Sequence, residues 1–179
     1  MLFEYEKLFL DDPVWLARAR RFSSKVRDIS AILLEHGAIP DTAGDKERVT
    51  YQPSCHLQYV MKMGEAPRRL LKRTADYVEL PDAKLCCGSA GIYNLIQGEM
   101  ADRILDQKMS HVKSTQADIV ITANPGCLLQ MQAGIARAGL SNAVKAMHIV
   151  DYLAKVGDRA GNRTPQKTNE KQHLASVSK

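Results

Sequence analysis

Short apolar runs that resemble strands alternate with helix-like segments from about residue 48 onward, and this alternation constrains the fold more than any other feature of the chain. The strongest run, Ile119-Val120-Ile121, is apolar at every position, which is typical of a strand buried on both faces of a parallel sheet. Strands are predicted over 48–52, 77–80, 118–123 and 145–149, and helices over 65–73, 99–114, 128–138 and 150–156. The pattern predicts an α/β fold, with a mainly parallel sheet and flanking helices.

Two further segments flank the predicted domain of residues 48–156. Residues 1–47 contain a long helical stripe that begins at Asp12-Pro13, an N-cap followed by proline at the first helical position, and ends at Gly37. We expect this N-terminal helical segment to pack on the domain. Residues 157–179 are rich in Asn, Gln, Thr, Ser and Lys and hold few apolar side chains, so a disordered polar tail is expected.

The composition excludes several classes of protein. The chain has 179 residues, of which 45% are hydrophobic and 25% charged, so it can bury one core of ordinary size and is neither collagen-like nor disordered throughout. The net charge is +5, but five basic and two acidic residues lie in 157–179, so that segment carries +3 of it. The mixed signs of the remainder argue against a nucleic-acid-binding surface.

The sequence also bears on location. No apolar run approaches the roughly 20 residues of a membrane helix, and the acidic start, Met1-Leu2-Phe3-Glu4, does not resemble a signal peptide. Four cysteines in 179 residues are too few for a disulfide scaffold. A reducing, cytoplasmic location is therefore expected.

All four cysteines follow predicted strands. Cys55, the pair Cys86-Cys87 and Cys127 come after the first, second and third strands respectively. Because the carboxyl ends of parallel strands lie at one edge of a sheet, three segments that are distant in sequence can bring these thiols together. Free cysteine is also a common buried apolar residue, but the shared position at strand ends favours convergence on a ligand.

Four converging thiols suit an iron–sulfur cluster, a tetrahedral zinc ion or thiol redox chemistry. Adjacent cysteines such as Cys86-Cys87 form a mutual disulfide only with strain, yet they can direct their thiols to different metal atoms. Cys127 stands at the start of a predicted helix, where backbone N–H groups favour the thiolate. Three glycines beside the thiols permit close approach of the backbone to an inorganic ligand and donation of N–H groups to it: Gly88, Gly91 and Gly126.

Three motifs carry a family resemblance: Cys55-His56-Leu57-Gln58, Leu85-Cys86-Cys87-Gly88-Ser89-Ala90-Gly91 and Thr122-Ala123-Asn124-Pro125-Gly126-Cys127. They resemble the cysteine-rich CCG domain, which occurs in one of the subunits of heterodisulfide reductase and in the iron–sulfur subunit of glycolate oxidase. The second and third motifs most resemble the C-terminal CCG domain of the glycolate oxidase subunit, and the resemblance covers about residues 1–154.

This resemblance implies a [4Fe–4S]-type centre held by Cys55, Cys86, Cys87 and Cys127, in an electron-transfer subunit of a glycolate oxidase-like oxidoreductase complex. It implies FAD-containing partner subunits that oxidise a 2-hydroxy acid, because nothing in this chain resembles a flavin site. The ferredoxin-like part of the resembled subunit is absent here, which implies a separate iron–sulfur chain or a missing N-terminal portion. Through such partners the chain is expected at the inner face of the membrane or in the cytoplasm.

Two alternatives remain open. Four thiolates also form a complete zinc site, so the chain could be a zinc-stabilised interaction module without redox activity. A thiol redox subunit similar to heterodisulfide reductase is the other alternative. It is less favoured, because Gln130 stands where the fullest CCG pattern has a further cysteine.

Overall fold

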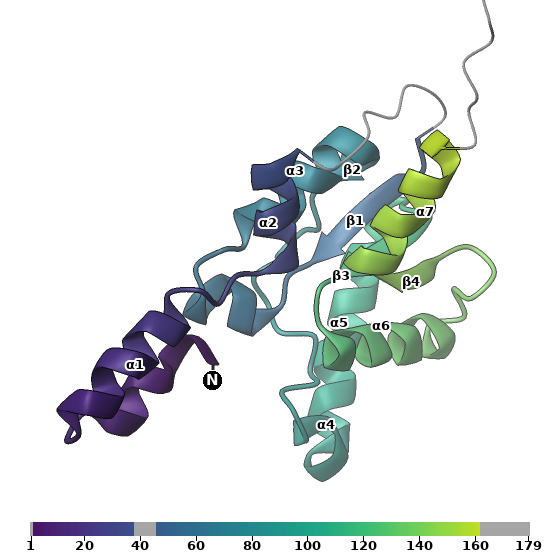
Figure 1. Cartoon of the computed structure of the whole chain (residues 1–179). Helices are drawn as coiled ribbons and strands as arrows, with labels where there is room; N and C mark the ends of the chain where they lie inside the picture. Colours follow the sequence, from purple (N-terminus) through teal and green to yellow (C-terminus); the bar gives the residue numbers. More distant parts are fainter. Residues whose placement is uncertain (1, 38–45, 162–179) are drawn as a thin grey trace, which may run out of the picture.

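The computed structural model describes residues 2–37 and 46–161. At its centre lies a four-stranded parallel sheet with the strand order β2-β1-β3-β4, which confirms the predicted α/β class (Figure 1). In this sheet Val49 pairs with Tyr77 on one side and with Ile119 on the other. The strands are β1 (Arg48–Gln52), β2 (Asp76–Val78), β3 (Ile119–Thr122) and β4 (Lys145–His148).

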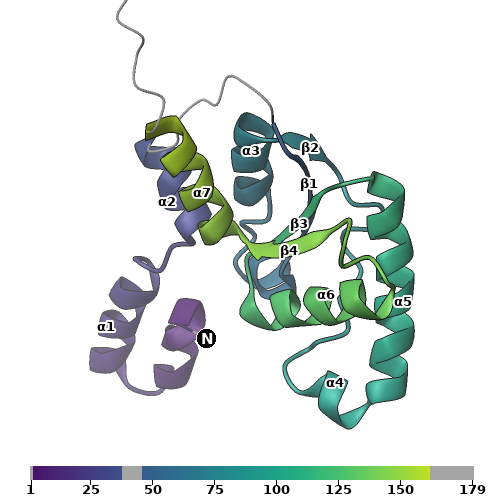
Figure 2. The ribbon, with the colours of Figure 1, turned by 90° about the vertical axis from the view of Figure 1, so that its right-hand side faces the viewer.

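Helices cover both faces of the sheet (Figure 2). On one face lie α5 (Gly98–Thr115) and α6 (Pro125–Arg137), and on the other lie α3 (Glu65–Thr74) and α7 (Ile149–Gly161). Each face has its own apolar core, and Cys87 and Cys127 belong to the core beneath α5 and α6.

Strand β3 serves both cores because successive side chains of a strand point to opposite faces. Ile119 and Ile121 enter the core beneath α3 and α7, whereas Val120 enters the core beneath α5 and α6. All three side chains are almost fully buried. The continuous apolar run in the sequence thus corresponds to a central strand with no solvated face, as predicted.

The long N-terminal helix is interrupted in the structure. Asp12 caps α1 (Pro13–Ser23) as expected, and its carboxylate accepts the backbone N–H groups of the first turn at 3.1 Å. A second cap, Asp28, then accepts the N–H of Ser30 at 2.9 Å and starts a separate helix, α2 (Ile29–His36). The apolar spacing continues across this break, but an aspartate side chain competes with the helix for backbone N–H groups.

The two halves of the N-terminal segment lie in different places (Figure 1). Helix α1 packs against a preceding 3₁₀ segment, η1 (Leu2–Phe9), whereas α2 packs on α3 and so joins the layer that covers the sheet. Trp15 on α1 is half exposed. Helix α2 is therefore part of the helical layer on the sheet, whereas α1 packs chiefly on η1.

The C-terminal helix is longer than predicted. Helix α7 was expected to end at Val156 and the polar tail to begin at Gly157, but the helix continues to Gly161. Glu47 accepts hydrogen bonds from Lys155 at 2.6 Å and from Arg159 at 3.2 Å, and these contacts fix the last turns of α7. The remainder of the expected tail, residues 162–179, lies outside the described residues. Within the described part of the chain, no helix has the length and apolar character needed to cross a membrane.

Candidate metal centre

The site lies where the chain changes direction across the sheet. From β1 the chain passes to β2 on one side, and it later returns to β3 on the other side of β1. In open parallel sheets the carboxyl ends of two such strands enclose the ligand-binding crevice. Cys55 follows β1 and Cys127 follows β3, so the outer two cysteines flank this crevice. Cys86 and Cys87 reach it through the irregular loop after β2.

The four thiols meet and form a series of contacts. Cys55 donates to Cys86, Cys86 to Cys87 and Cys87 to Cys127, so that each sulfur interacts with the next. Three segments distant in sequence thus bring their sulfurs together, as the positions of the cysteines at strand ends predicted. Cys87 and Cys127 are buried, Cys86 is partly exposed and Cys55 is exposed, so the series runs from the surface into the core.

Contacts within the series and burial together set the direction of each thiol pKa. The hydrogen bond that Cys87 donates to Cys127 raises the pKa of Cys87 to about 11. The hydrogen bond to Cys87, together with burial, raises the pKa of Cys86 well above its usual value. Although Cys55 as a residue is exposed, partial burial of its thiol and then the charge of Cys86 raise the pKa of Cys55. Cys127 only accepts, and its pKa is lowered by the thiol of Cys87 despite burial. Cys127 is therefore the thiol most readily ionised.

The lowering of the Cys127 pKa was predicted, but its cause differs from the expected one. Helix α6 begins at Pro125, not at 128, because the side chain of Asn124 caps it. That side chain accepts the backbone N–H of Cys127 at 3.1 Å, so this N–H serves the cap. The neighbouring Cys87 thiol has the largest effect on Cys127. Sequence reasoning placed the residue correctly but not the donor.

Backbone N–H groups do face the central pair of thiols. The N–H of Gly88 donates to Cys86 Sγ at 3.3 Å, and the backbone of Ser89 stabilises the thiolate of Cys87. Consecutive N–H groups thus point at consecutive sulfurs. Gly88 has φ +91°, and a Cβ there would lie 2.9 Å from the carbonyl oxygen of Ala101 on α5. This position requires glycine both for its backbone angle and for the close approach to α5.

The other two predicted glycines differ in their surroundings. Gly91 has φ +73°, and a Cβ there would have no heavy atom within 4 Å. Gly126 lies in the first turn of α6, where a Cβ would lie 3.1 Å from Ser89 Oγ and 3.2 Å from Asn124 Oδ1. Gly126 thus permits close packing of the cysteine loop on α6, while Gly91 supplies a turn in an open part of the loop. Their contact with a cofactor stays a prediction.

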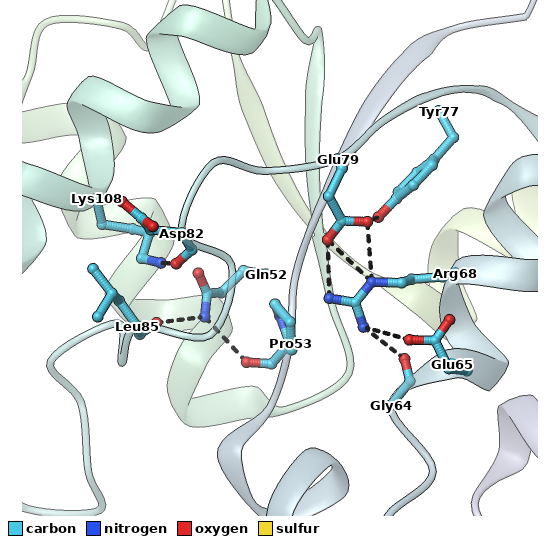
Figure 3. Close-up of polar contacts among 10 residues, drawn as sticks. All are labelled: Gln52, Pro53, Gly64, Glu65, Arg68, Tyr77, Glu79, Asp82, Leu85 and Lys108. Atoms are coloured by element: carbon cyan, nitrogen blue, oxygen red, sulfur yellow. Dashed lines mark hydrogen bonds and ion pairs between the residues drawn. The ribbon is translucent and has the colours of Figure 1, made fainter.

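Several polar contacts hold the loop that carries the cysteine pair (Figure 3). Gln52, at the end of β1, is almost fully buried and donates to the carbonyl oxygens of Leu85 at 3.4 Å and of Pro53 at 3.1 Å. Arg68 on α3 binds Glu79 through three N–H···O contacts of 2.9–3.1 Å. The segment from Glu79 to Leu85, which leads into the cysteine pair, is therefore bound at one end to α3 and at the other to β1.

Residues beyond the predicted set also surround the thiols. Gln130 is buried on α6 and accepts a hydrogen bond from Asn94 at 3.0 Å, which ties the short helix α4 (Tyr93–Ile96) to α6. Gln130 therefore has a structural role in place of a fifth cysteine. Lys108 on α5 is buried beside the thiols, and sequence reasoning missed it. The available signal was a lysine on the apolar stripe that Ala101, Leu105 and Val112 define.

The donor set fits a thiophilic metal. Sulfur ligands suit iron–sulfur clusters and zinc. One buried oxygen near the same edge of the sheet, Gln52 Oε1, has no hydrogen-bond partner among the described residues. Across residues 2–37 and 46–161, however, no three His, Cys, Asp or Glu side chains already stand in coordination geometry. The structure thus brings the four sulfurs near one another without arranging three of them around a metal position, and their role as ligands stays a prediction. His56, in the π-helical turn η2 (His56–Val60), is exposed.

Comparison with known proteins identifies a family model and several relatives. The family model of the cysteine-rich CCG domain matches residues 49–132. The probable glycolate oxidase iron-sulfur subunit of Bacillus subtilis is 47% identical over 167 residues, which are 91% of this chain and 37% of that protein. Lactate utilization protein A of Geobacillus kaustophilus is 34% identical over 86% of this chain and 64% of its own length. The protein of that name from Lysinibacillus sphaericus is 33% identical, over 86% and 68%.

The chain covers only part of these relatives, and this limits what the similarities imply. This chain spans about 37% of the glycolate oxidase subunit and about 64% of the first lactate utilization protein. Most of the glycolate oxidase subunit therefore has no counterpart in the 179 residues. The matched region of the CCG family model, in contrast, contains all four cysteines.

Proposed function

This chain belongs to the family of proteins with the cysteine-rich CCG domain, and from that premise we propose that it is an iron–sulfur electron-transfer component of an oxidoreductase complex. The observation that carries the proposal is the meeting of four thiols from three loops at the crevice between β1 and β3. Cys55, Cys86, Cys87 and Cys127 are the proposed ligands. An iron–sulfur cluster, when bound, accepts and releases single electrons.

We propose a [4Fe–4S] centre and a complex that oxidises a 2-hydroxy acid. Support comes from the names of the relatives, which concern glycolate oxidase and lactate utilization. Four thiolate ligands are the usual number for such a cluster. The 2-hydroxy acid would be oxidised at a FAD-containing partner, and further iron–sulfur groups would come from another chain or from the remainder of the longer relatives. In this proposal the isolated chain transfers electrons but does not itself oxidise the substrate.

The residues around the thiols have separate tasks in this proposal. The N–H groups of Gly88 and Ser89 point at the sulfurs of the central pair, and hydrogen bonds to ligand sulfurs are among the factors that set a cluster's reduction potential. Cys87 and Cys127 lie in an apolar core that excludes water. Cys55 is exposed, which leaves one side of the centre accessible to an electron-transfer partner.

The first experiment is anaerobic purification with measurement of iron, zinc and acid-labile sulfide per chain, followed by electron paramagnetic resonance of the reduced protein. The proposal predicts a brown protein with iron and sulfide in equal amounts. A colourless protein that holds one zinc per chain would contradict it and would support the zinc-stabilised module instead.

Variants separate ligation from folding. Replacement of Cys127 with Ser should abolish cluster incorporation, because a hydroxyl is a poor ligand for iron in such clusters. Val144→Ser is the matched control, since Val144 and Cys127 are both 7% exposed and belong to the same core. The control should lower stability but keep the iron content of the wild type. Equal loss of iron in both variants would indicate a general packing defect and would count against ligation by Cys127.

A further inference from the structure

A buried lysine lies beside the thiols and has no assigned role in the site. Lys108 on α5 is only 1% exposed, although lysine is among the residues least often buried. Burial of an ammonium group is unfavourable unless hydrogen bonds and opposite charges compensate for the lost hydration. The groups that offset the cost of burying the Lys108 ammonium therefore indicate the role of this residue.

One hydrogen bond accounts for only part of that compensation. Lys108 Nζ donates to the backbone carbonyl oxygen of Asp82 at 3.0 Å (Figure 3), and an ammonium group has three donors. The Asp82 carboxylate also attracts Lys108, but it is largely exposed and lies 3.7 Å from His111 Nε2. The turn at Asp82 thus holds the amine in place without neutralising it fully.

The cysteines would supply the remaining negative charge in their thiolate form, the form in which they bind a metal. Burial lowers the pKa of Lys108, and this effect is opposed, in decreasing order, by Cys87, Asp82, Cys86 and Cys55. Three of the four thiols therefore interact electrostatically with one buried amine. Lys108 and Cys86 also line the same cavity of about 220 Å³, together with Leu85, Ile104, Gln107 and His111.

We propose that Lys108 is a positioning residue that balances the negative charge of the thiolate-bound centre with a fixed positive charge. The inference rests on the proposed function, since it assumes that the thiols are ionised on a cluster. Net charge is one of the factors that determine the reduction potential of an iron–sulfur centre. Because reduction adds one negative charge to the site, a nearby cation stabilises the reduced form more than the oxidised form.

The test compares three variants of the full chain, purified anaerobically and loaded with iron and sulfide. Lys108→Gln removes the charge but retains an N–H donor, Lys108→Arg keeps the charge, and Lys113→Gln removes an exposed charge from the same helix. The readouts are iron per chain and the midpoint potential from a redox titration followed by electron paramagnetic resonance.

We expect Lys108→Gln to lower the equilibrium constant for one-electron reduction about tenfold, a shift of about 59 mV to lower potential. This is the order expected for a unit charge several ångströms away in a protein interior. Lys108→Arg should keep the equilibrium constant for one-electron reduction within a few-fold of the wild-type value. Lys113→Gln should have the midpoint potential of the wild type.

Two results would overturn the inference while leaving the proposed function intact. One is a loaded Lys108→Gln variant with the potential and iron content of the wild type. The other is an equal shift in Lys108→Arg and Lys108→Gln, which would mean that the shape of the lysine, not its charge, is needed. A wild-type protein that takes up no iron would instead refute the proposed function, and the inference with it.

Discussion

Replacement of Gly88 with Ala tests how tightly the cysteine loop is held against α5. The new Cβ would lie 2.9 Å from the carbonyl oxygen of Ala101 and 3.2 Å from Gln130 Nε2. Overpacking of this kind costs about 1–3 kcal/mol. The backbone angle of φ +91° adds about 1–2 kcal/mol for any residue with a Cβ. The expected loss is therefore about 2–5 kcal/mol, a large share of the roughly 5–15 kcal/mol of a typical domain.

Gly91→Ala is the matched control for this prediction. Gly91 also has a positive φ, +73°, but a Cβ there has no heavy atom within 4 Å, so only the backbone strain of about 1–2 kcal/mol applies. Urea unfolding of the metal-free, reduced protein measures both losses. We expect Gly88→Ala to be the more destabilising by about 1–3 kcal/mol and to bind less iron. Equal losses in the two variants would refute the close approach of Gly88 to α5.

Two further predictions concern the scaffold. Lys155 and Arg159 lower the pKa of Glu47 below its usual 4.5 although burial opposes them. The resulting stability, on the order of 1 kcal/mol, is present above that pH and is lost as pH falls through the folded-state pKa. Glu47→Gln should therefore destabilise the protein at pH 7 and flatten the pH dependence of urea unfolding between roughly pH 5 and 3; an unchanged slope would contradict the assignment. Gly134→Ala would place a Cβ 2.7 Å from Leu105 Cδ1 between α5 and α6, and it should lower the unfolding free energy by about 1–3 kcal/mol, whereas Gly157→Ala, where a Cβ meets nothing within 4 Å, should be neutral or stabilising.

The strands and most of the helices were predictable because local patterns determine them. Strand β1 has the bounds Arg48–Gln52, as expected from its β-branched and aromatic residues. Helix α5 lies within one residue of the predicted range at each end. The alternation of these elements was enough to infer a parallel sheet, and with it the common edge at which the cysteines lie.

The features that were missed depend on contacts that local patterns do not contain. The break between α1 and α2 arises from a side-chain cap at Asp28, and the extension of α7 depends on pairing of its last turns with Glu47, far away in sequence. The order of contacts among the four thiols, and hence the cause of the lowered pKa of Cys127, depends on which loop lies beside which. Sequence periodicity gives the face of a helix but not its neighbours.

Lys108 is an instructive case because a signal for it did exist. It occupies the buried stripe of α5, where a charged residue conflicts with the apolar pattern. Such conflicts occur where function outweighs stability. The sequence does not show what lies beside Lys108. The fold places the cysteine pair next to α5, and so beside this lysine.

In the proposed function, the four thiols exchange their mutual contacts for ligation of one iron–sulfur centre. X-ray absorption at the iron edge, on protein purified without oxygen, examines the ligand atoms directly. We expect a first shell made of sulfur alone in the wild type, and loss of this iron–sulfur signal in Cys55→Ser, because a hydroxyl is a poor ligand for iron in such clusters. Iron bound by nitrogen or oxygen in the wild type, or a spectrum that Cys55→Ser does not change, would contradict the claim.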